Sequence, residues 1–206
     1  LKYMASTDAT IIISTGMAYQ EEIDDAVNEI LLARPDKSKL IILHCTSNYP
    51  TSPENINLSK IKTLQERYQV SVGFSDHTEG WESAVQAVTL GAKVVEKHFT
   101  LNKKLPGPDH WFSSNPKEFQ ELVFQIRLAE KRMGFGELKP ANSEMKDRKQ
   151  WRLGLFWDQN MQAGDTIFKK DVAVRKPATD LLPKDLDSII GQKITRSCKK
   201  GEPVTK

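Results

Sequence analysis

The chain has 206 residues, and its 30 lysines and arginines against 27 aspartates and glutamates give a formal net charge of +3. Hydrophobic residues make up 38% and charged residues 28%, which excludes a disordered or fibrous chain and predicts a globular protein with a modest core. No apolar run approaches the roughly 18 residues of a membrane span, and so small a charge gives no reason to expect nucleic-acid binding. The two cysteines, Cys45 and Cys198, lie far apart without metal-type spacing, so we expect reduced thiols and a cytoplasmic protein.

Four short apolar runs, each followed by a helical pattern, alternate along the first 133 residues. The runs predict strands at residues 10–13, 40–43, 70–74 and 93–99. The helical patterns lie at residues 21–33, 58–68, 82–90 and 116–133, and the last carries an amphipathic stripe. Such alternation of strand and helix is typical of a parallel α/β sheet.

Four strand–helix units fit either an open doubly wound sheet or half of a (β/α)8 barrel, and both folds place functional side chains at the carboxyl ends of their strands. No G-x-G-x-x-G or Walker A motif follows the first strand, which argues against a nucleotide-binding fold. A complete barrel takes about 250 residues, so four further units, upwards of ~120 residues, would precede Leu1. We expect the half-barrel over residues 1–133, a linker without clear period over 134–150, and a compact module over 151–206.

Two histidines and a glutamate are expected to converge where the third and fourth strands end. Alternation along a strand puts Glu96 and His98 on one face, and it puts Ser75 and His77 together on the preceding strand. Imidazoles held by strands are good ligands for divalent metals, and a neighbouring carboxylate can act as a base. From the residues alone, the alternative that these histidines are hydrogen-bonded structural residues stays open.

Hydroxyl groups and a stiff loop provide further candidates. Ser14, Ser47 and Ser75 could hold phosphate oxygens together with loop N–H groups, or they could simply end strands and cap helices. After the fourth strand, the prolines of Pro106-Gly107-Pro108 exclude helix and central strand. This loop presents Asp109 at a fixed position, or it is a plain rigid connector.

Five motifs follow one another along the chain. They are Ile13-Ser14-Thr15-Gly16-Met17-Ala18, His44-Cys45-Thr46-Ser47-Asn48-Tyr49-Pro50-Thr51, Val72-Gly73-Phe74-Ser75-Asp76-His77-Thr78, Val95-Glu96-Lys97-His98-Phe99-Thr100-Leu101 and Pro106-Gly107-Pro108-Asp109-His110. Together they resemble the N-acetylneuraminate (sialic acid) synthase family, which includes legionaminate and pseudaminate synthases and spore-coat polysaccharide proteins. Residues 155–206 are similar to that family's C-terminal SAF module, which resembles type III antifreeze protein. The resemblance implies strands five to eight of a (β/α)8 TIM barrel, its C-terminal half, followed by a small β-rich SAF domain.

The resemblance also implies an enzyme. Such an enzyme would condense phosphoenolpyruvate with an N-acetylated hexosamine, either N-acetylmannosamine or a diacetamido-trideoxyhexose, to give a nine-carbon 2-keto sugar acid and phosphate. His77 and His98 would bind a divalent metal, Mn²⁺ or Mg²⁺, and Glu96 would lie beside the metal and the reacting carbons. The implied substrate contacts are Ser14, Ser47 and Ser75 for phosphoenolpyruvate, and Tyr49 and Asp109 for the sugar.

The family resemblance further implies a homodimer in which the SAF domain reaches the partner's barrel. The family's usual Lys-Arg-Pro-Gly is here Arg175-Lys176-Pro177-Ala178, so Arg175 or Lys176 would take the place of the sugar-binding arginine. The 206-residue chain alone is expected to be inactive. Two other functions stay open, a non-catalytic SAF-domain binding protein with a vestigial barrel and another aldol-type barrel enzyme acting on phosphorylated sugars.

Overall fold

A computed structural model describes residues 1–205 and divides the chain into two compact units, Leu1–Gly136 and Glu137–Lys206. The first unit holds a parallel sheet with helices, and the second a small antiparallel sheet. Across residues 1–205, no helix is both long enough and apolar enough to cross a membrane.

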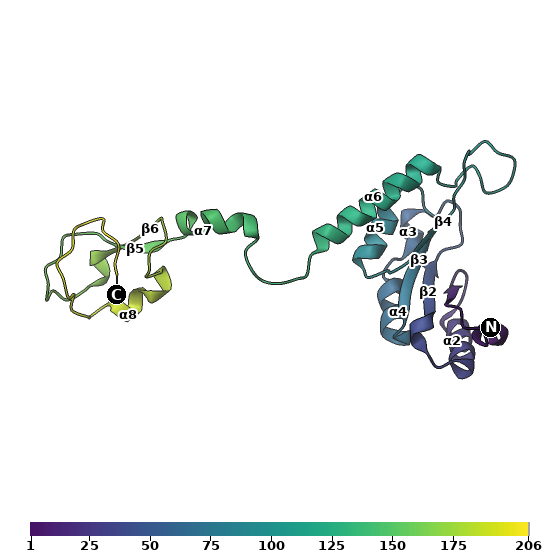
Figure 1. Ribbon diagram of the computed structural model, residues 1–206, viewed down its shortest axis with the longest axis horizontal. Coiled ribbons are helices and arrows are strands. Elements are labelled where there is room, and N and C mark those ends of the chain that lie inside the picture. Colours follow the sequence, from purple (N-terminus) through teal and green to yellow (C-terminus); the bar gives the residue numbers. More distant parts are fainter. Residues whose placement is uncertain (206) are drawn as a thin grey trace. The chain divides into compact units, whose positions relative to one another are not determined.

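The first unit is built on a four-stranded parallel sheet whose spatial order follows the order along the chain (Figure 1). Its strands are β1 (Ile11–Ser14), β2 (Leu40–Cys45), β3 (Ser71–Asp76) and β4 (Val95–Lys97). Its helices are α1 (Lys2–Ala5), α2 (Gln20–Ala33), η1 (Lys37–Lys39), α3 (Pro53–Ile56), α4 (Lys60–Tyr68), α5 (Glu82–Thr89) and α6 (Pro116–Met133). The alternation of strands and helices predicted from the sequence is confirmed, and the sheet has the parallel arrangement of a half-barrel.

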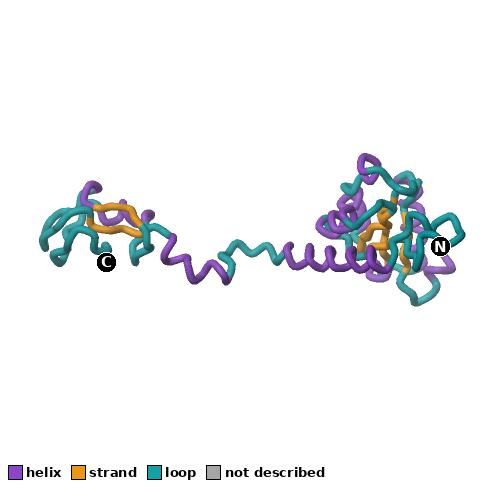
Figure 2. Tube along the Cα trace, turned by 90° about the horizontal axis from the view of Figure 1, so that it is seen from above, coloured by secondary structure: helices purple, strands orange, loops and turns teal. Residues whose placement is uncertain are grey.

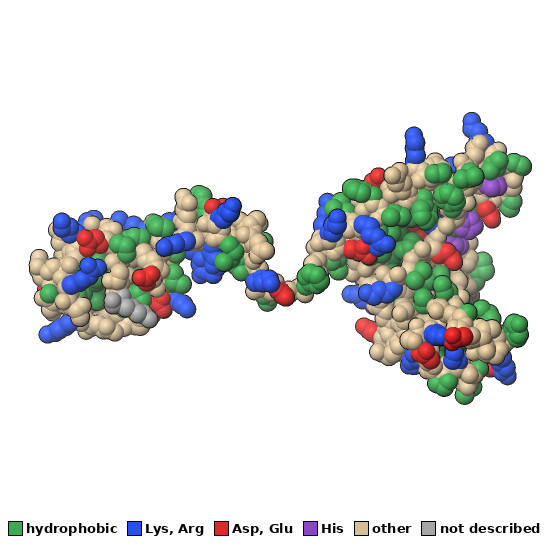
Figure 3. Space-filling view, viewed as in Figure 1, with side chains coloured by type: hydrophobic (Ala, Val, Ile, Leu, Met, Phe, Trp, Pro, Cys, Tyr) green, Lys and Arg blue, Asp and Glu red, His purple; other side chains and the backbone are tan. Residues whose placement is uncertain are grey.

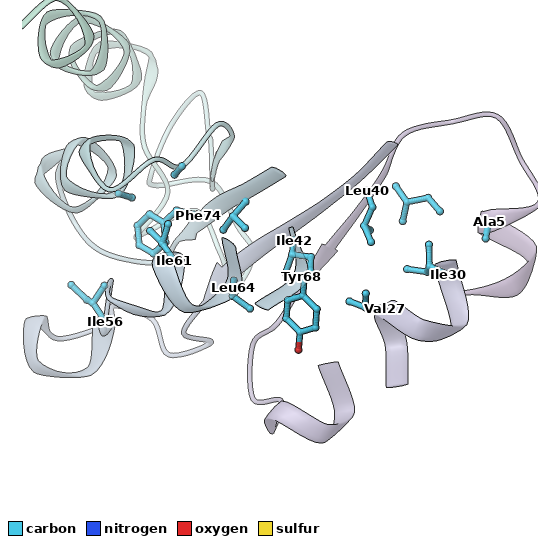
Figure 4. Packing of buried hydrophobic residues seen from close by; sticks show 14 residues of the cluster. Ala5, Val27, Ile30, Leu40, Ile42, Ile56, Ile61, Leu64, Tyr68 and Phe74 are labelled. Carbon is cyan, nitrogen blue, oxygen red and sulfur yellow. The ribbon is translucent and has the colours of Figure 1, made fainter. Parts of the chain in front are cut away.

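The core of this unit lies between the sheet and the helices α2 and α4. Leu40 and Ile42 of β2 are fully buried, and Figure 4 shows them among side chains of both helices. Burying an aliphatic side chain of this size stabilises a fold by roughly 1.5–3 kcal/mol. Gly73 of β3 keeps the sheet close-packed, because a Cβ there would lie 2.5 Å from Leu43 Cδ2 and 2.6 Å from the Val94 carbonyl oxygen.

Helix α6 has the bounds that the sequence predicts, and its ends explain why. The Asn115 side chain accepts hydrogen bonds of 3.0 Å from the N–H groups of Lys117 and Glu118, while Glu118 accepts one of 2.9 Å from the Asn115 N–H. Pro116 occupies the first helical position, where its missing N–H costs nothing. Gly134 follows with a φ of +58°, which a helix end tolerates best in glycine.

Strand β4 is shorter than predicted. The apolar pattern predicted a strand over residues 93–99, but the ladder with β3 covers only Val95–Lys97. Beyond Lys97 the chain changes partner, because the Ser114 N–H donates to the His98 carbonyl at 2.8 Å and the Thr100 N–H donates to the Ser114 carbonyl at 2.9 Å. His98 therefore lies just outside the strand, and simple alternation does not fix where its side chain points.

The second half of the predicted linker over residues 134–150 contains η2 (Asn142–Glu144) and most of α7 (Met145–Trp151), which no apolar period predicted. The sequence Met-Lys-Asp-Arg-Lys-Gln-Trp has neither glycine nor proline and consists mainly of good helix formers, so one short helix forms without an apolar period.

The second unit is small and consists mostly of loops and turns (Figure 2). Its two strands β5 (Gly154–Trp157) and β6 (Val172–Arg175) pair antiparallel, and isolated bridges such as Met161–Cys198 tie the loops together. The remaining helices are η3 (Lys169–Asp171), η4 (Pro183–Asp185) and α8 (Leu186–Ile189). Leu155, Trp157 and Leu181 are at the centre of its own hydrophobic core.

Candidate active site

A row of polar side chains lies at the carboxyl end of the sheet. Cys45 of β2, Ser75 of β3 and Glu96 of β4 are neighbours in the strand register. The Ser75 hydroxyl donates a 2.7 Å hydrogen bond to Glu96 Oε1. Glu96 is exposed to solvent. The sheet thus presents a carboxylate and a hydroxyl side by side, at the end where parallel α/β folds bind their ligands.

The imidazoles of His77 and His98 lie next to this row. Their ring centroids are 5.8 Å apart and their planes meet at 85°. His77 Nε2 is 3.4 Å from Ser75 Oγ and 3.7 Å from Cys45 Sγ, whereas its Nδ1 is buried without a hydrogen-bond partner in the described chain. Burial and the nearby charge of His98 lower the pKa of His77, which favours the neutral imidazole that binds metals.

A buried ion pair fixes the backbone around His77. Lys97 Nζ lies 2.8 Å from Asp76 Oδ2, and these side chains are only 5% and 0% exposed. Asp76 Oδ1 accepts from the N–H and the hydroxyl of Thr78 at 2.9 and 2.7 Å, while Lys97 donates to the Thr78 carbonyl at 2.6 Å. Lys97 points away from Glu96, as strand alternation predicts. The pair holds residues 76–78, and with them His77, in one arrangement.

Aromatic rings cover the two histidines. Tyr49 stacks between His77 and Phe112, with both centroid separations 4.0 Å and interplanar angles of 26° and 20°. His98 meets the rings of Tyr49 and Phe112 at steep angles, with centroids 4.6 and 5.2 Å away. In Figure 3, histidine side chains reach the surface of the first unit beside hydrophobic ones.

The Tyr49 hydroxyl is buried and has no hydrogen-bond partner among the described residues. Burial first, and then nearby acidic groups that include Glu96 and Asp109, raise the pKa of Tyr49 well above its usual range. The phenol therefore stays protonated and can donate a hydrogen bond. Asp109 is exposed, lies outside the sheet in the loop that follows β4, and is within electrostatic reach of Tyr49.

The two remaining serine candidates lie at the same end of the sheet. Ser14 is the last residue of β1 and is exposed. Ser47 lies so close to the backbone of Gly16 that a Cβ at Gly16 would overlap Ser47 Oγ and lie 3.3 Å from Cys45 Sγ. Glycine at position 16 therefore leaves the room that the Ser47 hydroxyl occupies.

Arg175 and Lys176 belong to the second unit and have partners within it. The Arg175 guanidinium pairs with Asp158, and Lys176 Nζ lies 4.5 Å from the centroid of the Trp151 ring. Both residues are exposed. Each unit thus presents its candidate side chains separately.

His77 and His98 are two side chains of the candidate site with the chemistry to ligate a divalent metal. Among residues 1–205, no three His, Cys, Asp or Glu side chains are grouped closely enough to hold a metal ion. His77 and His98 nevertheless suit a divalent ion whose other ligands are oxygen atoms of water or substrate, and Nδ1 of His77 has no hydrogen-bond partner among the described residues. The residues present thus fit two ligands of a divalent metal site.

Phe112 is the member of this cluster that sequence reasoning missed. Phenylalanine carries no chemistry that marks a site, and its place in the cluster depends on the path of the loop after Asp109. Its one signal was its position three residues beyond the motif's Asp109.

Comparison with known proteins identifies the family. Residues 1–138 match the model of the NeuB family, and residues 154–206 match the model of the SAF domain. The chain belongs to the NeuB family. This agrees with the resemblance read from the five motifs, and the SAF match covers most of the second unit.

Similar proteins include several synthases of sialic acid type. The N,N'-diacetyllegionaminic acid synthase of Legionella pneumophila is 38% identical over 203 residues, which are 98% of this chain and 57% of that protein. The human N-acetylneuraminate-9-phosphate synthase is 31% identical over 197 residues, which are 94% of this chain and 54% of that protein. The chain therefore spans little more than half the length of these relatives.

Solved structures of two similar proteins support the fold. The spore coat polysaccharide biosynthesis protein SpsE of Bacillus subtilis superposes with a TM-score of 0.62 at 32% identity, over 99% of this chain and 62% of that one. The N-acetylneuraminic acid synthetase of Leptospira borgpetersenii, solved with citrate, gives a TM-score of 0.63 at 38% identity, over 71% of this chain and 50% of that one.

Proposed function

We propose that this chain is the C-terminal part of a nonulosonate synthase, which joins phosphoenolpyruvate to an N-acetylated hexosamine and releases phosphate. The support is the convergence of Ser75, Glu96, His77, His98 and Tyr49 at the carboxyl end of a parallel sheet in a chain of the NeuB family. Because the chain covers 57% of a relative such as the Legionella synthase, the other barrel strands would come from residues outside it. We use the term complete barrel for the protein that consists of this chain together with those further strands.

The reaction adds three carbons to six. The electron-rich C3 of the enol phosphate attacks the aldehyde carbon of the open-chain sugar and forms the new C–C bond. The aldehyde oxygen takes up a proton and becomes a hydroxyl group, and water adds at C2 with loss of one proton. The C2–O bond to phosphate then breaks with its electron pair going to the phosphate oxygen, and the new C2 hydroxyl loses its proton as the 2-keto group forms. Ser14 and Ser47 are proposed to orient the carboxylate and phosphate of phosphoenolpyruvate through hydroxyl hydrogen bonds. Ser75 is proposed to contact phosphoenolpyruvate while its one hydroxyl proton stays on Glu96 Oε1.

The carboxylate of Glu96 is proposed to take up the proton of the attacking water. Its Oε1 is held by the Ser75 hydroxyl at 2.7 Å, which orients the group, and its exposure lets a substrate approach. Where a divalent ion is bound, Mn²⁺ or Mg²⁺, His77 and His98 would hold it, and it would polarise the aldehyde oxygen as a Lewis acid. Tyr49 and Asp109 are proposed to bind the sugar.

The second unit is proposed to act on a partner subunit in a homodimer. Arg175 and Lys176 are exposed there, so the cationic groups are accessible to the sugar bound in another barrel. Either side chain can donate hydrogen bonds to an N-acetyl carbonyl, although only arginine offers a planar fork.

Phosphate release by the complete barrel tests this function. Phosphoenolpyruvate, Mn²⁺ and a panel of N-acetylated hexosamines are supplied, and the nine-carbon 2-keto acid is identified by mass spectrometry. Phosphate and product should appear together in equal amounts with at least one hexosamine. Phosphate release that does not depend on the sugar, or no release at all, would refute the assignment.

A further inference from the structure

Phe112 lies at the centre of the aromatic cluster that covers the two histidines. Its ring stacks on Tyr49 at 4.0 Å, meets His98 at 5.2 Å, and contacts Trp111 edge-on at 4.9 Å. Phe112 is partly buried, whereas Trp111 is 56% exposed. The contacts of Phe112 are therefore directed toward the candidate site.

The backbone holds Phe112 firmly in this position. The next two residues, Ser113 and Ser114, are 3% and 6% exposed. The Ser113 hydroxyl donates to the Asp109 carbonyl at 2.6 Å, and the Ser114 N–H donates to the His98 carbonyl at 2.8 Å. The segment that carries Phe112 is thus bonded directly to the segment that carries His98.

The Tyr49 ring is clamped on both faces, with His77 on one side and Phe112 on the other. The clamp fixes the plane of the ring and, with it, the place of a buried hydroxyl that has no partner in the described chain. A buried hydroxyl without a partner is unfavourable, and an oxygen atom of a bound ligand would relieve that cost. The arrangement has the features of a donor prepared for a ligand.

We propose that Phe112 is a positioning residue which presents the Tyr49 hydroxyl to an oxygen atom of the acceptor sugar. This inference rests on the proposed function, in which Tyr49 binds the sugar and serines bind phosphoenolpyruvate. The ring of Phe112 pairs with Tyr49, His98 and Trp111, so we expect its effect to be confined to the sugar. The competing explanation is that Phe112 only anchors its loop.

The test compares Michaelis constants for both substrates in the complete barrel. Phe112→Ala and Phe112→Leu should raise the sugar KM roughly three- to tenfold, which corresponds to the strength of one aromatic pair, and leave the phosphoenolpyruvate KM within about twofold. Phe119→Leu is the matched control, because Phe119 pairs edge-on with Phe99 at 5.6 Å outside the cluster. The control should change neither constant.

A double variant separates positioning from anchoring. Tyr49→Phe keeps the stack but removes the hydroxyl, and it should raise the sugar KM by a similar factor. If Phe112 acts through that hydroxyl, Phe112→Ala combined with Tyr49→Phe should exceed the larger single effect by less than twofold. The Phe112→Tyr variant should keep the sugar KM of the parent protein, because it retains an aromatic ring against Tyr49.

Three results would overturn the inference alone: an unchanged sugar KM, equal rises in both constants, or multiplying effects in the double variant. Each would mean that Phe112 serves only the loop. A parent protein that releases no phosphate would instead refute the proposed function, and this inference with it.

Discussion

The buried pair of Lys97 and Asp76 should be a principal determinant of the stability of the first unit. Replacing Lys97 by methionine keeps most of the side-chain volume but leaves the Asp76 carboxylate, which is 0% exposed, without its counter-charge. Breaking a buried pair from one side costs about 3–5 kcal/mol. Thr78 still donates two hydrogen bonds to Asp76 Oδ1, so we expect the lower end, about 3 kcal/mol.

Hydrogen exchange measured by mass spectrometry can follow each unit separately. A loss of about 3 kcal/mol lowers the protection of peptides from β3 and β4 by a factor on the order of 10². Peptides from β5 in the second unit should keep their protection and so provide an internal reference. Adding Asp76→Asn to the Lys97→Met variant should recover at least half of the loss, because the uncompensated charge is removed while Oδ1 still accepts from Thr78.

The matched control is Lys103→Met. Lys103 Nζ also lies 2.8 Å from a carboxylate, that of Glu118, but the two side chains are 38% and 47% exposed. Such a pair contributes about 0–1 kcal/mol. If Lys97→Met reduced protection by less than tenfold, or by no more than Lys103→Met, the reasoning from burial would be refuted.

Three further predictions concern other parts of the chain. His44 is fully buried, and burial lowers its pKa, so the unfolded state binds the proton more strongly. The free energy of unfolding, measured in urea, should therefore fall as the pH drops below about 6.5, by up to ~1.4 kcal/mol per pH unit. Gly73→Ala forces a methyl group into close contact with neighbouring strands and should destabilise the first unit by about 1–3 kcal/mol in thermal unfolding. In the complete barrel, Arg175→Ala or Lys176→Ala should raise the sugar KM more than the phosphoenolpyruvate KM, and mixing either variant with His98→Ala chains should restore activity through one intact mixed site.

Each of these predictions has a control experiment that could contradict it. A His44→Gln variant should lose that part of the pH dependence, and an identical profile in both proteins would contradict the assignment to His44. Ser71→Ala at the exposed start of β3 should change stability by less than about 0.5 kcal/mol, so an equal effect at Gly73 would contradict the packing argument. Mixed dimers that form but recover no activity would show that the second unit does not serve its partner's site.

The repeating elements of the first unit were predictable because their signals are local. Short apolar runs and the Asn115–Glu118 cap lie within a few residues of the structure that they specify. The end of β4 was not predictable from local sequence. It depends on the backbone hydrogen bond from the Ser114 N–H to the His98 carbonyl, and these residues are far apart along the chain. Helix α7 was missed because its residues favour helix without showing an apolar period.

Some features of the candidate site were likewise predictable from the sequence, and others were not. Ser75, Glu96 and His77 could be brought together from strand alternation and the rule that ligands bind at the carboxyl ends of parallel strands. The buried pairing of Lys97 with Asp76 joins residues 21 positions apart on neighbouring strands, which requires the strand register. The stacking of Phe112 on Tyr49 depends on a loop whose path no pattern encodes.

The central claim is that the polar row and the two histidines at the end of the sheet carry out a metal-assisted condensation. Its most direct test is phosphate release from phosphoenolpyruvate by the complete barrel with Mn²⁺ and the hexosamine panel, compared with the His98→Ala and Glu96→Gln variants and with the 206-residue chain alone. We expect sugar-dependent release from the complete barrel, a loss of at least about 10²-fold in each variant, and none from the chain alone. Full activity in either variant, or release that needs no sugar, would contradict the account.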